Sequence, residues 1–220
     1  MIAHRIDVAV FSVAFAVWGL VLLALAWSGD WAYAGIAEAS GSTTATFVTS
    51  SGTQELRLPE LLAWHRQWAA YVIGYGAEPG GDGVFTADEH AHMTDVREVF
   101  RGAETAAALC AVVILFRLAR ARRRGMALLL LRDGALVAVA MVAVIGVVAT
   151  LAFDELFLLF HQVFFPRGNF LFDPATSNLL RLYPDWYWQA ITGAVTLSFI
   201  TLSLLVAVAA HLSLRPRAGS

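Results

Sequence analysis

The chain has 220 residues, of which 59% are hydrophobic and 15% are charged, and its mean hydropathy is +0.66. Soluble domains carry about 45–50% apolar and about 25% charged residues, so the composition predicts an integral membrane protein, and the net charge of -2 argues against a nucleic-acid partner. All 15 basic residues are arginine and a single cysteine is present, which excludes lysine Schiff-base chemistry, a P-loop, an internal disulfide and a thiolate metal cage.

Four apolar segments approach the roughly 20 residues that a helix needs to cross a bilayer core about 30 Å thick. The second segment is the shortest, because its uninterrupted apolar core lies between Glu104 and Arg117. Long charged side chains at such positions extend toward the interface, so this segment still counts as a span. We predict an all-α membrane protein, a single integral domain over residues 1–220, with four transmembrane helices at about 6–27, 102–120, 133–153 and 187–211.

The arginines predict the orientation, because short loops rich in positive charge stay in the cytoplasm. Arg5 precedes the first span, six arginines lie within residues 117–132, and two more follow the fourth span. Both termini are therefore expected in the cytoplasm. The connections 28–101 and 154–186 are then extracytoplasmic loops, and they hold four of the six histidines.

The first outer loop is long enough to form a small extracytoplasmic cap. Residues 44–49 and 54–58 are β-prone and are separated by a Ser- and Gly-containing turn, which predicts a β-hairpin. Pro59 suits the first turn of a helix that runs to about Gly74, with an aromatic face that extends to Tyr75. The cap is thus expected to contain a hairpin and short helices.

A second helix of this loop is predicted to continue into the membrane. Thr86 and Glu89 have the spacing of a capping box, and only Gly102 interrupts the helical pattern that follows. His92 and Asp95 are three residues apart and share one face of this helix. Asp95 is therefore placed to orient the His92 ring and to select its tautomer.

The second outer loop combines apolar and polar residues. Residues 157–165 are apolar enough to lie in the lipid interface, yet they contain His161. Asp173 and the proline after it predict a turn, and residues 178–182 predict one turn of helix. A polar group in so apolar a setting needs a partner, which draws attention to His161.

Histidine acid–base chemistry is the mechanism that remains after the other classes are disfavoured. His65 and His90 are interpreted as structural, whereas His92 and His161 are the candidates for proton transfer. The sequence contains no H-E-x-x-H spacing, which would predict a metal site, and no G-x-S-x-G motif, which would predict a serine nucleophile. Cys110 lies within an apolar span and reads as a small buried hydrophobic residue.

Several motifs of the outer loops resemble those of one family. Phe160-His161-Gln162-Val163-Phe164-Phe165, Asn169-Phe170-Leu171-Phe172-Asp173-Pro174 and Leu180 with Tyr183-Pro184 resemble the signature of the bacterial lipoprotein intramolecular transacylases and their uncharacterised relatives. His92-Met93-Thr94-Asp95-Val96 looks like the second outer motif of that family. The four spans and the long first outer loop agree with the same resemblance.

The resemblance implies an O-to-N acyl transfer. The sn-2 acyl chain of a diacylglyceryl-modified lipoprotein would move to the α-amine of its own N-terminal cysteine, without a cofactor, and the partners would be such lipoproteins and membrane lipid. It implies a multi-pass protein of the bacterial cytoplasmic membrane with its active site on the extracytoplasmic side. Because the substrate carries both ester and nucleophile, the enzyme needs only to move protons and to stabilise an oxyanion.

The resemblance also implies a role for each motif residue. His161 would be the leading general acid or base, His92 its counterpart, and Asp95 the residue that orients His92. Oxyanion donors would come from Arg167, Asn169 or the backbone at Gly168; Asp173 would hold the loop in an Asx-type turn; and the acyl groove would include Phe160 and Phe164. This sequence departs from the family at Gln162 and at Ser177-Asn178, where acidic residues are expected.

Two alternatives remain open on the residues alone. One is a non-enzymatic membrane protein whose cap binds lipid or a partner protein, with histidines that serve only as structural hydrogen-bonding groups. The other is a phospholipid acyltransferase or hydrolase.

Overall fold

The computed structural model describes residues 2–80 and 83–214. In this part of the chain, contacts divide the protein into two compact units. We call them the membrane unit (Met1–Ala24, Ala103–Leu151 and Gly193–Ser220) and the cap unit (Leu25–Gly102 and Ala152–Thr192). Each unit is described by itself.

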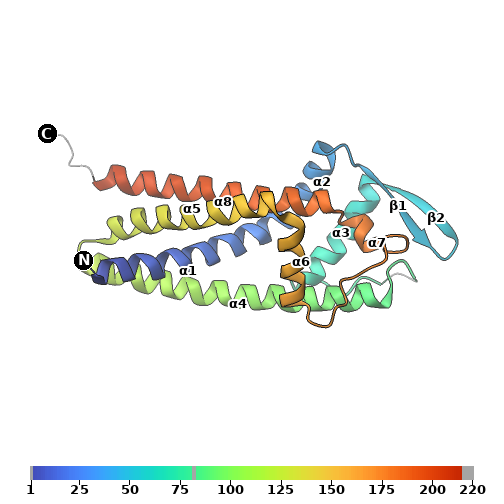
Figure 1. Cartoon of the computed structure of the whole chain (residues 1–220), viewed down its shortest axis with the longest axis horizontal. Helices are drawn as coiled ribbons and strands as arrows, with labels where there is room; N and C mark the ends of the chain where they lie inside the picture. The colour runs from blue at the N-terminus through green and yellow to red at the C-terminus, as the bar shows by residue number, and fades with distance from the viewer. Residues whose placement is uncertain (1, 81–82, 215–220) are drawn as a thin grey trace. The chain divides into compact units, whose positions relative to one another are not determined.

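The long helices of the fold are α1 (Ile2–Trp27), α4 (Ala87–Arg123), α5 (Ala127–Leu151) and α8 (Asp185–Leu214) (Figure 1). Among the described residues these are the 4 helices that are long and apolar enough to cross a membrane. The four predicted transmembrane helices are thus confirmed. The second differs most from its prediction, because α4 has 37 residues and begins well before Gly102.

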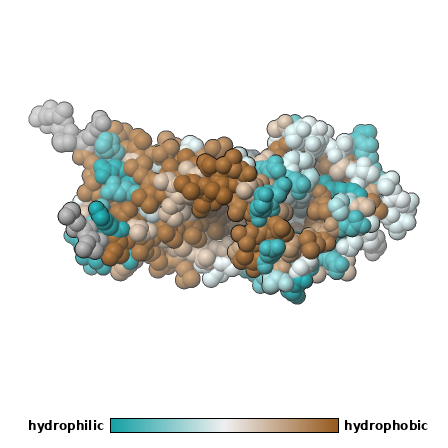
Figure 2. Space-filling view, viewed as in Figure 1, coloured by the Kyte–Doolittle hydropathy of each residue, from teal (hydrophilic) through white to brown (hydrophobic). Residues whose placement is uncertain are grey.

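Large apolar side chains cover the outside of the membrane unit, which Figure 2 shows as a continuous hydrophobic surface over the long helices. Leu109, Val144 and Leu205, for example, are each at least 60% exposed. In water such a surface would be unfavourable, whereas lipid chains are its natural solvent. The composition that predicted a membrane protein therefore corresponds to lipid-facing rather than to buried side chains.

Small residues let the helices of the membrane unit approach one another. Phe11 is completely buried, and a Cβ added to Gly134 of α5 would lie 2.3 Å from its ring. The Ser12 hydroxyl donates to the carbonyl oxygens of Val8 and Gly134. Close contact through glycine together with hydroxyl-to-carbonyl hydrogen bonds is how helices associate where lipid removes the hydrophobic driving force.

The cap unit contains α2 (Asp30–Ala39), β1 (Thr44–Thr49), β2 (Gly52–Arg57), α3 (Leu58–Val72), α6 (Phe153–Phe164) and α7 (Asn178–Leu182). The strands form an antiparallel hairpin in which Thr44 pairs with Arg57 and Thr49 with Gly52. The predicted hairpin is confirmed, and its second strand begins at Gly52, whose φ of 123° permits the tight turn. The predicted helical turn at residues 178–182 is confirmed as α7.

The aromatic face of α3 forms the centre of the cap core, as predicted for its first four turns. Leu61 and Trp68 are buried there, together with Phe47 of β1 and Leu182 of α7. The prediction was wrong at Tyr75, which is 90% exposed. The helix ends at Val72 and the chain turns through Gly74, with φ of 87°, so later residues leave the face.

A buried polar network ties the cap elements together. The Asn178 side chain accepts a hydrogen bond from the Val48 amide and donates to the carbonyl oxygens of Val48 and Val84. One side chain thereby satisfies the backbone of β1 and of the segment that precedes α4. Buried amides of this kind specify position because each lost partner costs free energy.

Candidate active site

Two elements of the cap unit bring His92 and His161 together. His92 lies in the first part of α4 and His161 in α6, and their rings stack with centroids 5.9 Å apart and planes inclined by 17°. The two histidines selected from the sequence thus share one site. His161 is carried by α6, residues 153–164, for which the sequence predicted no secondary structure.

The tautomer of His161 follows from its hydrogen bond. Nδ1 lies 2.8 Å from the carbonyl oxygen of Phe157, four residues earlier in α6. A carbonyl oxygen only accepts, so Nδ1 carries the proton and Nε2 of the neutral ring keeps its lone pair. Burial lowers the pKa of His161, and the Phe157 carbonyl opposes this effect. The ring is therefore a neutral base at neutral pH.

His92 is more deeply buried than His161 and lies among aromatic rings. Its ring centroid is 4.7 Å from that of Phe165 and 5.4 Å from that of Phe172. The helix α4 has 37 residues, or about 55 Å by the rise per residue, so a bilayer core of about 30 Å leaves its charged first part, with His92, outside. Burial within the protein lowers the pKa of His92 well below its usual value, and the neighbouring His161 lowers this pKa further.

Asp95 does not orient His92 directly, which corrects the prediction. Its carboxylate instead accepts hydrogen bonds from Arg167 and from Asn169, the latter at 2.8 Å. The Asp95 charge raises the pKa of His92 only at a distance and does not overcome burial. The hydrogen-bond geometry assigns Asp95 to the loop after α6 rather than to the imidazole.

Asn169 is the side chain best placed to orient His92. Among the described residues, His92 Nδ1 and Asn169 Oδ1 are both buried without a hydrogen-bond partner. The Asn169 carboxamide also acts to raise the pKa of His92, as an acceptor beside the ring does. Because Asn169 donates its Nδ2 to Asp95, Oδ1 remains the atom that can accept from the imidazole. The hydrogen bond to Asp95 thus fixes Asn169, whereas Asn169 Oδ1 and His92 Nδ1 make no hydrogen bond to each other.

The oxyanion donors predicted from the loop have different surroundings. The Gly168 amide donates to the Phe165 carbonyl at 3.0 Å and forms part of a turn in which Gly168 has φ of 72°. That N–H group is occupied, whereas the roles predicted for Arg167, Asn169 and the other backbone N–H groups near Gly168 stay predictions. The Arg167 side chain is 75% exposed.

Asp173 has the predicted structural role. Its Oδ1 accepts a hydrogen bond from the Ala175 amide at 2.9 Å, which is an Asx turn, and its carbonyl oxygen accepts from the Ser177 amide. These bonds shape the loop between α6 and α7. Asp173 therefore supports the site without facing the histidines.

Phe160 and Phe164 lie on an open apolar surface of α6. They are 43% and 50% exposed, and their ring centroids are 4.7 Å apart. The Phe160 ring also contacts the edge of the His161 ring, with centroids 5.6 Å apart. An apolar surface thus begins directly beside the candidate base.

Glu89, which the sequence predicted only as a capping residue, also makes tertiary contacts. Its side chain is completely buried, and it accepts hydrogen bonds from the Thr86 amide, the Ser177 hydroxyl and the Leu179 amide. The capping box predicted the first of these bonds, which the structure confirms together with the return bond to Thr86 Oγ1. The other bonds join the start of α4 to α7, and no local pattern signals such a tertiary contact.

The remaining outer histidines have structural surroundings. His65 is buried with Nδ1 3.1 Å from the Tyr183 hydroxyl, and His90 Nδ1 is 2.7 Å from Glu78. Within the described residues no group of three or more histidine, cysteine, aspartate or glutamate side chains is arranged to hold a metal ion.

The comparisons with known proteins agree with this geometry. The sequence model described as lipoprotein intramolecular transacylase Lit matches residues 6–188. No curated protein sequence is significantly similar to the chain.

Solved structures share the fold. The in meso structure of the membrane integral lipoprotein intramolecular transacylase Lit from Bacillus cereus superposes with a TM-score of 0.73 at 14% identity, over 96% of this chain and 95% of that chain. Two variants of that enzyme, with one histidine replaced by arginine or by alanine, superpose with TM-scores of 0.71 at 14% identity, over 96% of this chain and 91% and 93% of theirs. The family model covers most of the chain, and on this evidence the chain belongs to the lipoprotein intramolecular transacylase family.

Proposed function

We propose that this transacylase moves the sn-2 acyl chain of a diacylglyceryl-modified lipoprotein onto the α-amine of its N-terminal cysteine, and that His161 and His92 carry the proton transfers. The observation that supports this most directly is the stacking of the buried His92 ring on the half-buried His161 ring, with centroids 5.9 Å apart. Family membership disfavours both alternatives, the non-enzymatic membrane protein and the phospholipid acyltransferase or hydrolase.

The substrate brings its own nucleophile, so the site needs no nucleophilic side chain. The α-amine, with a pKa of about 7.7–8.0, attacks the ester carbonyl, so that an N–C bond forms and the glyceryl C–O bond breaks. One proton leaves the amine and one reaches the glyceryl oxygen, so the overall reaction neither consumes nor releases a proton. The enzyme must relay that proton and stabilise the intermediate oxyanion.

His161 is assigned the transfer of the proton from the amine to the glyceryl oxygen. With Nδ1 bound to the Phe157 carbonyl, Nε2 accepts the amine proton and then donates it to the leaving glyceryl oxygen. The Phe157 carbonyl stabilises the imidazolium between these two steps, as an acceptor opposite a catalytic nitrogen does. A histidine whose pKa is lowered by burial returns its proton readily.

His92 is assigned as the counterpart of His161 in these proton transfers. Its lowered pKa keeps the ring neutral, and with the Nδ1 proton on the side of Asn169 Oδ1 the lone pair of Nε2 is available to take up a proton. Asn169 Oδ1 would accept from Nδ1, while Asn169 Nδ2 donates to Asp95. Arg167, which binds the same carboxylate, adds positive charge to this side of the site.

The acyl chain and the membrane orientation complete the proposal. Phe160 and Phe164 offer the acyl chain an apolar surface next to His161. We place the protein in the bacterial cytoplasmic membrane with both termini inside and the site on the extracytoplasmic side. The arginine distribution supports this orientation, because the arginine-rich region from the end of α4 to the first turns of α5 is expected in the cytoplasm.

A reporter lipoprotein tests the proposal in a host that otherwise makes only diacylglyceryl lipoproteins. We expect mass spectrometry of its N-terminal peptide to show the N-acylated lyso form with the wild-type chain. His161→Ala and His92→Ala should each reduce its formation by about a hundredfold or more, the usual contribution of general acid–base catalysis.

His211→Ala is the matched control, because His211 is exposed near the end of α8 and far along the chain from the site. This variant should form the product at the wild-type rate. Undiminished product in both site variants, with normal membrane insertion, would contradict the assigned roles. Absence of product from the wild-type chain would contradict the proposed substrate.

A further inference from the structure

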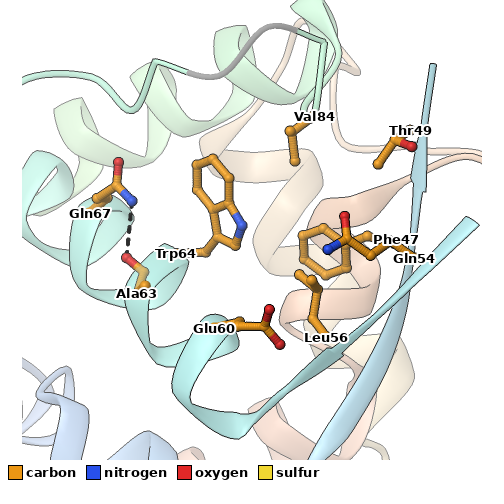
Figure 3. Close-up of a pocket in the computed structure, with 9 residues that line it drawn as sticks. All are labelled: Phe47, Thr49, Gln54, Leu56, Glu60, Ala63, Trp64, Gln67 and Val84. Carbon is orange, nitrogen blue, oxygen red and sulfur yellow. Dashed lines mark hydrogen bonds between the residues drawn. The ribbon is translucent and has the colours of Figure 1, made fainter. Parts of the chain in front are cut away.

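The cap unit contains a cavity that the reaction described above does not use. It has a volume of about 390 Å³ and lies between the hairpin and α3. Figure 3 shows the Trp64 indole from α3 and the Phe47 ring from β1 approaching it from different sides. The residues that line it are Phe47, Thr49, Gln54, Leu56, Glu60, Ala63, Trp64, Gln67 and Val84.

This lining is mixed, with apolar walls and several polar side chains. Gln67 donates to the Ala63 carbonyl, and Glu60 accepts from the Arg57 amide, so both are partly used within the cap. Gln54 is exposed; its backbone belongs to the hairpin ladder opposite Phe47, and its side chain makes no hydrogen bond to another described residue. An acyl chain in this cavity would remove these polar groups from water without replacing their hydrogen bonds, which costs free energy.

The second strand of the hairpin adds an open row of backbone groups beside the cavity. Within the described part of the chain, β2 pairs with β1 and with no other strand. Its residues from Gly52 to Glu55 are exposed. An unpaired strand edge presents N–H and C=O groups that an extended polypeptide can pair with, while its side chains enter adjacent pockets.

The cavity is also within reach of the catalytic pair. Val84 lines the cavity and is eight residues before His92 in the sequence. Three residues of connection and five residues of helix limit the distance between these two residues to about 18 Å. An extended polypeptide covers that distance in about six residues.

We propose that this cavity binds the polypeptide segment of the substrate that follows its lipidated cysteine. The inference rests on the proposed function, in which the cysteine is held at His161 and His92. A lipoprotein must continue from that cysteine as a polypeptide. Its residues beyond about the sixth would pair with the edge of β2 and place a side chain between Trp64 and Phe47.

A substitution that fills the cavity tests the proposed binding site without removing an existing contact. Ala63→Phe places a ring in the cavity, because Ala63 is an exposed lining residue of α3. The purified full chain is assayed with two diacylglyceryl lipopeptides, one of two residues and one of twelve. We expect the ratio of kcat/KM for the long over the short substrate to fall about tenfold relative to the wild-type chain. Ala39→Phe, at an exposed position of α2 outside the cavity, should keep the wild-type ratio.

Photo-crosslinking identifies the occupant. With benzoylphenylalanine in place of Gln54, the twelve-residue lipopeptide should become attached through a residue beyond the sixth. Attachment to a second copy of the chain or to lipid, or an unchanged substrate ratio in Ala63→Phe, would overturn the inference while leaving the proposed function intact. Failure of the wild-type chain to convert either lipopeptide would overturn both.

Discussion

His161 can act as a base only through Nε2, because its Nδ1 proton is held by the Phe157 carbonyl. This single bond selects the tautomer, and burial lowers the pKa of the same ring. A histidine with an unshifted pKa of about 6.5 would be partly protonated in mildly acidic surroundings. Partial burial moves the protonation of His161 to lower pH, so the state of the substrate amine should dominate the pH dependence.

The pH profile of kcat/KM tests this conclusion. Protonation of His161 or His92 removes activity only below their lowered pKa values, whereas the amine loses its proton at about pH 8. We expect kcat/KM for a lipopeptide to rise with pH along one limb with an apparent pKa of about 8. A separate inflection at pH 6–7 would show that a histidine titrates near its ordinary value and would contradict the burial argument.

At the scale of elements, Glu89 decides how α4 and α7 fit together. Its Oε1 accepts from the Ser177 hydroxyl and the Leu179 amide, and its Oε2 accepts from the Thr86 amide. A carboxylate is the side chain that can accept at both oxygens in a completely buried position. The three bonds anchor the end of the loop that carries Arg167 and Asn169, so a capping residue also supports the site.

Glu89→Gln should destabilise the cap. Glutamine has the same shape, but its NH₂ group would face a donor in place of one acceptor oxygen. The lost bond and the unsatisfied buried groups should lower the free energy of unfolding by about 1–3 kcal/mol. Thermal unfolding in detergent micelles measures the change as a lower Tm.

Glu98→Gln provides the comparison on the same helix. Glu98 is exposed and pairs with Arg101 at the surface, where ion pairs contribute little. The Tm of Glu98→Gln should stay close to that of the wild-type chain. Equal Tm values for Glu89→Gln and the wild-type chain would show that Glu89 does not anchor α7.

At the scale of the whole molecule, the distribution of charge gives the protein its proposed orientation. Asp7 pairs with Arg117, and Asp133 with His4, so these two acidic residues of the membrane unit have basic partners. Most of the other acidic residues belong to the two predicted outer loops. Arginine-rich short loops are retained in the cytoplasm, which sets the direction of all the spans together.

Cysteine accessibility tests that orientation. In a Cys110→Ala background, which removes the natural thiol, Ser51→Cys marks the hairpin turn and Arg123→Cys marks the end of α4. A membrane-impermeant maleimide applied to whole cells should label Ser51→Cys at once and Arg123→Cys only after permeabilisation. The reverse pattern would place the site in the cytoplasm.

The sequence by itself determined the spans, the hairpin, the capping box and the two histidines. These depend on local signals, namely apolar length, β-prone runs around a turn, an S/T-x-x-E spacing and short motifs. Motif resemblance also found Asn169 and Arg167 as members of the site. The three-residue spacing assigned Asp95 to His92, which was wrong, because the two residues share a helix face but not a hydrogen bond, and Asp95 binds Arg167 and Asn169 instead.

Only the tertiary structure decided which groups meet. The Asp95–Asn169 contact, the bonds of Glu89 to Ser177 and Leu179, and the cavity beside the hairpin join segments whose proximity no local pattern encodes. Hydrogen bonds act over about 3 Å, so their partners follow from packing rather than from spacing along the chain. The sequence thus indicated which residues are candidates for the proposed chemistry, and packing decided which groups lie next to them.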